Sequence, residues 1–211
     1  MKLYRLIFLL TSLSASVGFA QPVDFHPIEN LEGFKKKFSE EGKKIVSIHS
    51  DFVQEKAMAL LEEKIISKGL FWYKQHQKVR IEYQTPFHHL IIMNGDQILI
   101  KENQKESKVS IRSSKLFQQI NRIIIECVNG SILESNDYTS RVFENDKMYW
   151  LELVPVSKTL RSFFQSIQVV VDKKDWLAVS ITLNEPGGDN TVMRFSAKVL
   201  NEKLDDELFV R

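Results

Sequence analysis

The spacing of apolar residues changes near residue 45 and divides the chain into two kinds of pattern. From Ile28 to Lys44, apolar residues recur at helical spacing, for example at Leu31 and Phe38, while charged residues fill the other positions. This pattern predicts an amphipathic helix that lies on a core with its charged face in water. From Ile45 onward the period becomes two, which indicates β-strands whose successive side chains point to opposite faces.

The period-two pattern predicts about ten or eleven short strands. Asn94-Gly95 is the clearest hairpin signal between them, because both residues tolerate a positive φ. The connections are too short to hold crossover helices, so the strands must run antiparallel. An antiparallel sheet of this size curls or closes rather than staying flat. The predicted strands are 45–55, Ser67–Lys74, Lys78–Tyr83, His88–Met93, Gln97–Lys101, Lys108–Arg112, Tyr138–Glu144, Met148–Pro155, Ile167–Asp172, Trp176–Leu183 and Thr191–Leu200.

A second helical pattern interrupts the strands between Ser113 and Asn129. Its run Ile123-Ile124-Ile125 spreads apolar side chains over roughly 200° of arc, which is wider than one face on a core requires. Either this helix is deeply buried, or part of its surface faces a ligand. A short helical turn is also predicted near Thr159–Phe164. The expected fold is therefore mainly β with some α, an incomplete, strongly curved antiparallel β-barrel with helices forming a lid or plug.

The first twenty residues have the pattern of a secretory signal peptide. Lys2 and Arg5 precede an apolar run, and Gly18-Phe19-Ala20 matches the small-x-small sequence that precedes signal peptidase cleavage. We expect cleavage after Ala20, a periplasmic location, and a single domain over residues 21–211. The alternative is an uncleaved membrane anchor, but the apolar run is short and interrupted by Ser and Thr.

The charge balance of the mature chain is close to zero. The full sequence holds 29 Lys and Arg against 27 Asp and Glu, and removing Lys2 and Arg5 makes the two numbers equal. A protein that binds nucleic acid needs a basic surface, so we expect no nucleic-acid partner.

Residues that would support catalysis or metal binding are sparse. The neighbours His88 and His89 would point to opposite faces of a strand, so they cannot jointly hold a metal ion. Glycine-rich phosphate loops and nucleophile elbows do not occur in the sequence. Cys127 is the single cysteine, and its apolar neighbours indicate a small buried side chain rather than a reactive thiol. We therefore expect no catalytic residue, no cofactor, no metal and no enzymatic activity.

Several sequence stretches resemble the outer-membrane lipoprotein carrier protein family (LolA) in their order and spacing. They follow the N-terminal apolar segment and the first predicted helix, and they span about half of the mature chain. The stretches are Ser50–Lys56 (SDFVQEK), Ser67–Lys74 (SKGLFWYK), Val79–Pro86 (VRIEYQTP) and Ile92–Ile98 (IMNGDQI).

This resemblance implies an incomplete β-barrel whose apolar cavity shelters the acyl chains of lipoproteins crossing the periplasm. It also implies a monomer that receives cargo from an inner-membrane releasing complex and passes it to an outer-membrane acceptor. In the family, a basic residue after a Trp-x-Lys stretch is associated with cargo handover. The matching position here is Gln75, followed by His76 instead of proline, whereas Arg80 fits a common family pattern. The resemblance thus places a handover region at Gln75 and Arg80.

The preferred function is a periplasmic carrier that delivers lipoproteins toward the outer membrane. Two alternatives keep the fold: a carrier of another amphiphile, of the glycolipid or aryl-polyene type, or a lipid-sensing protein that regulates a partner. In each case the ligand would occupy an apolar cavity between sheet and helix. The residues expected to line it are Phe52, Leu70, Trp72, Ile81, Tyr83, Ile92, Leu116, Ile120 and Ile124.

Overall fold

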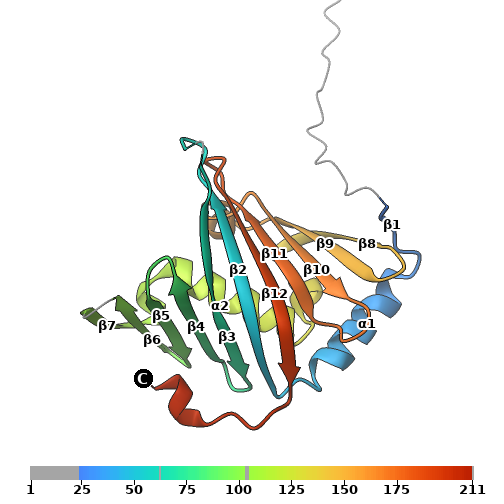
Figure 1. Cartoon of the computed structure of the whole chain (residues 1–211). Helices are drawn as coiled ribbons and strands as arrows, with labels where there is room; N and C mark the ends of the chain where they lie inside the picture. The colour runs from blue at the N-terminus through green and yellow to red at the C-terminus, as the bar shows by residue number, and fades with distance from the viewer. Residues whose placement is uncertain (1–23, 62, 103–104, 211) are drawn as a thin grey trace, which may run out of the picture.

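A single antiparallel sheet of twelve strands joins almost the whole chain in the computed structural model, which describes residues 24–61, 63–102 and 105–210. The expected signal peptide, Met1–Ala20, lies outside the described residues. The strand order is β1-β8-β9-β10-β11-β12-β2-β3-β4-β5-β6-β7 (Figure 1). All neighbouring strands in this sheet run antiparallel.

The strands and helices have the following bounds. The strands are β1 His26–Pro27, β2 Ser47–Ala57, β3 Ile65–Lys74, β4 Lys78–Thr85, β5 His89–Asn94, β6 Gln97–Glu102, β7 Lys105–Ser110, β8 Tyr138–Glu144, β9 Met148–Pro155, β10 Ser166–Asp172, β11 Ala178–Asn184 and β12 Asn190–Leu200. The α-helices are α1 Leu31–Gly42, α2 Lys115–Val128 and α3 Lys158–Arg161, and short 3₁₀ turns occupy Ile111–Ser113, Ile132–Glu134 and Asp206–Phe209.

The predicted fold class is confirmed, with differences at the margins. The additional strand is β1, whose two residues are too few to show any period, and which pairs with β8 at the edge of the sheet. The predicted strand at Lys108–Arg112 is displaced, because β7 ends at Ser110 and the chain then enters a 3₁₀ turn. The first helix begins later than predicted, at Leu31, where the Asn30 side chain accepts a hydrogen bond from the Gly33 amide.

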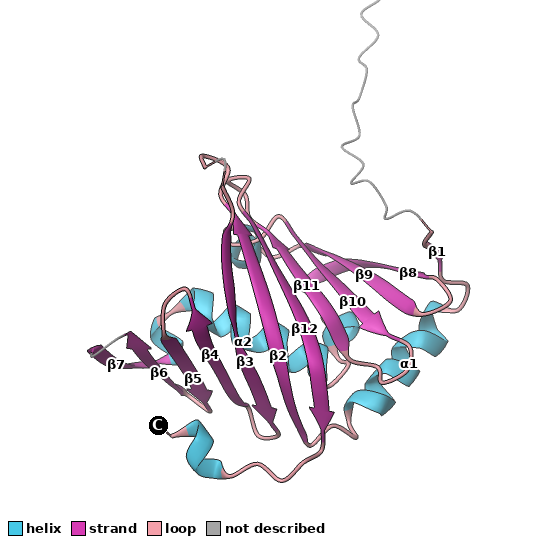
Figure 2. Ribbon diagram, in the orientation of Figure 1, coloured by secondary structure: helices cyan, strands magenta, loops and turns pink. Residues whose placement is uncertain are grey.

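The order of the strands forces α2 to cross the sheet. Strands β2 to β7 form one meander and β8 to β12 a second, and the two are joined where β12 pairs with β2. The chain therefore leaves β7 at one edge and must reach β8 near the opposite edge. Helix α2 lies in this connection and runs along one face of the sheet (Figure 2). We call that face the inner face and the opposite one the outer face.

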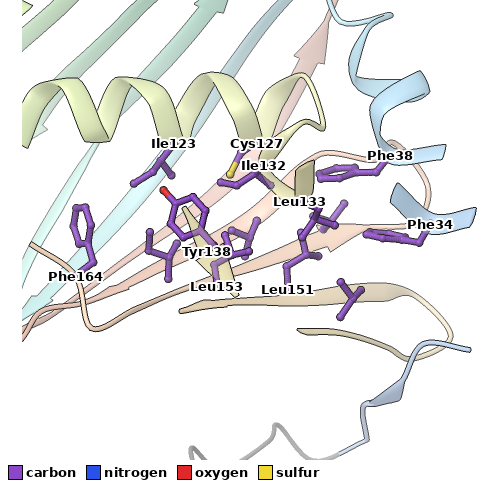
Figure 3. Close-up of a cluster of buried hydrophobic side chains, with 14 of the residues drawn as sticks. Phe34, Phe38, Ile123, Cys127, Ile132, Leu133, Tyr138, Leu151, Leu153 and Phe164 are labelled. Carbon is purple, nitrogen blue, oxygen red and sulfur yellow. The ribbon is translucent and has the colours of Figure 1, made fainter. Parts of the chain in front are cut away.

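Two apolar clusters cover the inner face on either side of α2. One joins Phe34 and Phe38 of α1 to Ile123 and Cys127 of α2, above strands β8, β9 and β10 (Figure 3). The other lies over β2 to β6 and includes Phe52, with Phe117 and Ile124 of α2 packed against it. No described helix is both long and apolar enough to span a membrane.

The C-terminal ends of α1 and α2 meet at two glycines. A Cβ atom at Gly42 would lie 2.3 Å from the Asn129 carbonyl carbon, and one at Gly130 would lie 2.3 Å from the Phe38 carbonyl oxygen. Gly130 lies just after the end of α2 and has a φ of 73°, a backbone conformation that favours glycine. These contacts fix the C-terminal end of α2 against α1.

Replacing Gly42 by alanine should lower the free energy of unfolding by about 1–3 kcal/mol, because the added methyl group forces the two backbones apart. Chemical denaturation followed by circular dichroism measures the change. Gly187→Ala is the matched control, because a Cβ atom there meets nothing within 4 Å and should leave stability nearly unchanged. Equal effects of the two substitutions would contradict a close contact between α1 and α2.

Candidate ligand-binding cavity

A cavity of about 630 Å³ lies between α2 and the inner face of the sheet. This volume is typical of pockets that enclose small molecules. Alternate residues of the strands line it, as the pleat of a sheet requires. They include Ile48 and Gln54 of β2, Ile81 and Tyr83 of β4, and Ile181 and Leu183 of β11.

Helix α2 closes the cavity with one part of its wide apolar surface. Leu116, Ile120 and Ile124 line the cavity, while Ile123 and Cys127 reach both the cavity and the buried cluster beside it. Both explanations of its broad apolar arc therefore apply, burial in the core and exposure to a cavity. One part of the helix is packed in the core, and another part borders open volume.

The structure places five of the residues expected to line a cavity at its wall: Ile81, Tyr83, Leu116, Ile120 and Ile124. Phe52 lies on the same face of the sheet but is 1% exposed and packed within the adjoining cluster, with its ring 5.1 Å from that of Tyr83. It supports the wall and does not line the cavity.

Three expected residues, Leu70, Trp72 and Ile92, lie on the outer face, so their assignment to the cavity is wrong. The pairing of Phe52 with Gly69 puts Phe71 on the inner face and turns Leu70 and Trp72 outward. In β5, Met93 belongs to the inner cluster and Ile92 to an outer one. A shift of one residue reverses every side chain in a strand.

The outer cluster is covered by the C-terminal segment. Leu204 and Phe209 pack with Ile92 and Leu99, and Trp72 lies against them. Lys74 donates a hydrogen bond of 2.8 Å to the Leu204 carbonyl oxygen. The segment thus covers part of the outer face of β3 to β6, near the lower ends of these strands in Figure 1.

The expected handover residues also lie away from the cavity. Arg80 is on the outer face, where it donates a 2.9 Å hydrogen bond to the Leu208 carbonyl oxygen and pairs with Glu82 at 2.6 Å. Gln75 lies in the turn between β3 and β4, and its side-chain amide donates to the Ile45 carbonyl oxygen at 3.0 Å. Both residues hold neighbouring backbone segments in place.

Burial keeps the Tyr83 hydroxyl and the Cys127 thiol at the cavity wall neutral. Burial raises the pKa of Tyr83 to about 12, and its hydroxyl donates a 2.8 Å hydrogen bond to Gln54 Oε1. Burial also raises the pKa of the Cys127 thiol to about 12, so this thiol stays protonated. Within residues 24–61, 63–102 and 105–210, no cluster of three His, Cys, Asp or Glu side chains is placed to hold a metal ion.

Two polar residues at the wall, Ser50 and Lys198, were not found from the sequence. Ser50 lies between Ile48 and Phe52 on one face of β2, where a serine resembles an ordinary strand position. In the sequence, Lys198 continues the alternation of Arg194 and Ser196, so its side chain would be expected to point outward. A bulge in β12 turns it to the inner face instead. At the other end of the cavity, Lys56 pairs with Glu185 at 2.8 Å.

The sequence profile described as "Outer membrane lipoprotein carrier protein LolA" matches residues 43–211. The chain belongs to the LolA family. The match begins just before β2 and includes eleven of the twelve strands, α2 and the C-terminal segment that covers the outer face. The family is therefore shown for the part of the chain that forms the cavity.

Solved structures share this LolA-like fold at low sequence identity. MucB is 12% identical, with a TM-score of 0.50 over 84% of this chain and 61% of that protein. An uncharacterised conserved protein from Thermus thermophilus is 9% identical, with a TM-score of 0.50 over 84% of this chain and 91% of the other. A LolA superfamily protein from Nitrosomonas europaea is 13% identical, with a TM-score of 0.44 over 84% and 97% of the two chains. No curated protein sequence matches significantly.

On the side of α2 away from the cavity, one carboxylate of this LolA-family protein is partly buried without full pairing. Burial raises the pKa of Glu126, Asp137 raises it further, and Arg122 opposes the shift. Glu126 Oε2 has no hydrogen-bond partner among the described residues, and Arg122 lies closer to Asp137, at 2.5 Å, than to Glu126, at 3.9 Å. The ionised carboxylate therefore costs stability in the folded state.

Glu126→Gln should stabilise the protein at pH 7 and have little effect near pH 3.5. Because the folded state binds the Glu126 proton more tightly than the unfolded state, this residue's contribution to stability falls as pH rises through its unfolded and then its folded pKa. At pH 3.5 the carboxyl is protonated and resembles the amide. Thermal unfolding at both pH values measures the difference. A variant that is less stable at pH 7 would show that the Arg122 interaction outweighs burial.

Proposed function

We propose that the protein is a periplasmic carrier that shelters acyl chains and delivers acylated cargo, lipoproteins in the first place, toward the outer membrane. The observation that carries this proposal is the apolar cavity of about 630 Å³ between α2 and the inner face of the sheet. Membership of the LolA family supports the same function.

The energetics of acyl chains explain why such a cavity is needed. Each methylene removed from a membrane into water costs about 0.8 kcal/mol, so a lipidated molecule does not leave a bilayer unaided. A cavity lined by side chains such as Ile81, Ile120 and Met193 offers a comparable apolar environment. Transfer between membrane and carrier then becomes nearly balanced, and a membrane partner can set its direction.

The proposed location follows from the sequence and the family together. Met1–Ala20 has the pattern of a cleavable signal peptide, and lipoprotein carriers of this family act between the two membranes. The proposed partners are an inner-membrane complex that releases cargo and an outer-membrane acceptor. A carrier of another amphiphile would use the same cavity, and mass spectrometry of the lipid that copurifies from the periplasm distinguishes these cargoes.

Ile124→Asp should weaken the binding of a fluorescent fatty-acid probe at least tenfold, because it places a charge against hydrocarbon. The wild-type protein should bind this probe with micromolar or better affinity, measured by fluorescence titration. Gln118→Asp is the control, since it adds the same charge to α2 at a position that does not line the cavity. Equal losses in the two variants, or no binding by delipidated wild-type protein, would contradict the proposal.

The same aspartate substitution should destabilise the fold less at Ile124 than at Ile92. Ile124 is half-buried beside open volume, whereas Ile92 is 2% exposed and enclosed between β5 and the C-terminal segment. Urea denaturation of Ile124→Asp and Ile92→Asp gives the comparison. A larger decrease in the free energy of unfolding for Ile124→Asp would mean that α2 is part of the rigid core.

Helix α2 should be the element whose protection depends most on ligand. Its C-terminal end is fixed against α1, but at its N-terminal end Leu116 is 40% exposed at the cavity edge. Hydrogen exchange should therefore slow at residues 113–129 when an acyl ligand fills the cavity, and change little in α1. Equally strong protection of α2 with and without ligand would exclude a mobile cover.

A further inference from the structure

The cavity has a polar group at the end of β2 opposite Lys56. Ser50 lines the cavity and is 1% exposed, and its hydroxyl has no hydrogen-bond partner among the described residues. Lys56 is six positions further along β2, a distance of about 20 Å along the strand. One leaflet of a bilayer has an apolar depth of about 15 Å, so the cavity is long enough for one acyl chain.

A β-bulge places Lys198 across from Ser50 on the neighbouring strand. In the pairing of β12 with β2, Ser196 faces Asp51 and Val199 faces His49, so two residues, Ala197 and Lys198, lie opposite Ser50. Ala197 adopts a φ of 50°, which is uncommon for a residue other than glycine. Without the extra residue, Lys198 would point outward. The bulge instead turns its side chain to the cavity wall, where it is 13% exposed.

The charge of Lys198 is balanced, but its hydrogen-bonding capacity is not used up. Its ammonium lies 2.7 Å from Asp175 Oδ2, and Asp175 Oδ1 accepts a hydrogen bond from the Leu177 amide at 3.0 Å. An ammonium carries three N–H donors, and the described residues place only this one carboxylate beside it. The site therefore has unused donors at Lys198, an unused hydroxyl at Ser50 and almost no net charge.

We propose that this site binds the polar end of a single-chain amphiphile that enters the cavity polar end first, and that this end is an uncharged oxygen group such as a hydroxyl. Lys198 and Ser50 donate to that oxygen, while the strand residues above them enclose the chain. A carboxylate is disfavoured, because it would add a second negative charge next to Asp175 in a buried site. The proposal rests on the proposed binding of apolar chains in this cavity. It selects a single-chain amphiphile, the alternative cargo, over a lipoprotein, whose acyl chains would enter methyl end first.

A purely apolar end would leave the site unsatisfied. When the methyl end of a chain fills this region, it excludes water from Ser50 and Lys198 and supplies no partner in return. The site thus favours ligands whose inner end is polar over ligands whose inner end is a methyl group. The rest of the cavity, with Phe71, Met193 and Leu177 among its lining residues, accepts hydrocarbon of any origin.

Displacement of a fluorescent acyl probe by 1-dodecanol and by dodecane tests the proposal. Ser50→Ala should reduce the affinity for 1-dodecanol about five- to tenfold, and Lys198→Met at least tenfold, while both leave the affinity for dodecane unchanged or higher. Thr191→Val is the control, because it changes a hydroxyl at another part of the wall and should affect both ligands equally. Equal losses for the two ligands in Ser50→Ala would overturn the proposal.

Asp175→Asn tests the role of charge at the site. The amide keeps an oxygen for the Leu177 amide but removes the negative charge, so Lys198 can then pair with a ligand anion. The affinity for dodecanoate relative to 1-dodecanol should rise at least tenfold in this variant. An unchanged ratio would overturn the assignment of Lys198 to the ligand. If folded wild-type protein binds neither dodecanol nor dodecane nor the probe, acyl binding itself fails and this inference fails with it.

Discussion

The path of the chain from β7 to β8 is the constraint on which the rest of the structure depends. These two strands lie toward opposite edges of a twelve-stranded sheet, so the segment between them must cross its inner face. A single helix of 14 residues, α2, makes this crossing and cannot fill the whole concavity of so wide a sheet. The volume that remains beside it is the cavity. Space for a ligand is thus a consequence of topology and not of a local loss of packing.

The two ends of α2 differ in how closely they are packed. At its C-terminal end, Gly130 and Gly42 allow backbone contact with α1 that leaves no room for a side chain. At its N-terminal end, Leu116 is partly in water and borders the cavity. Apolar surface around a void loses the contacts that a filled core would provide, so the empty protein is less stable than it would be with a compact interior. A ligand in the cavity would restore those contacts and would couple binding to the order of the helix.

The outer face of the sheet shows the opposite arrangement. There the C-terminal segment covers Trp72 and Ile92, and Arg80 and Lys74 bind its backbone carbonyl groups. Lys74 and Lys78 hold the pKa of the Asp206 carboxyl down to about 2, so this attachment stays charged over the physiological range. A fixed segment therefore covers part of the outer face, and a helix beside a cavity covers the inner face.

The sequence by itself determined the class of fold. The period of two, the short connections and the Asn94-Gly95 turn specify antiparallel strands. The wide apolar arc of residues 113–129 indicates a helix that is either deeply buried or partly exposed to a ligand. The stretches from Ser50 to Ile98 were enough to place the chain with LolA proteins, as the family match confirms. These features are local, because they depend on backbone preferences and on spacing within single elements.

Only the tertiary structure decided which face of each strand lines the cavity. Strand β3 carries large apolar side chains on both faces, Leu70 and Trp72 on one and Phe71 and Tyr73 on the other, so its pattern does not reveal the inner face. The choice depends on cross-strand register and on what covers the outer face, here a C-terminal segment more than 100 residues away in sequence. The bulge that turns Lys198 inward likewise depends on cross-strand pairing, here of β12 with β2. Alternation is a property of one strand, but the direction in which it points is set by its partners.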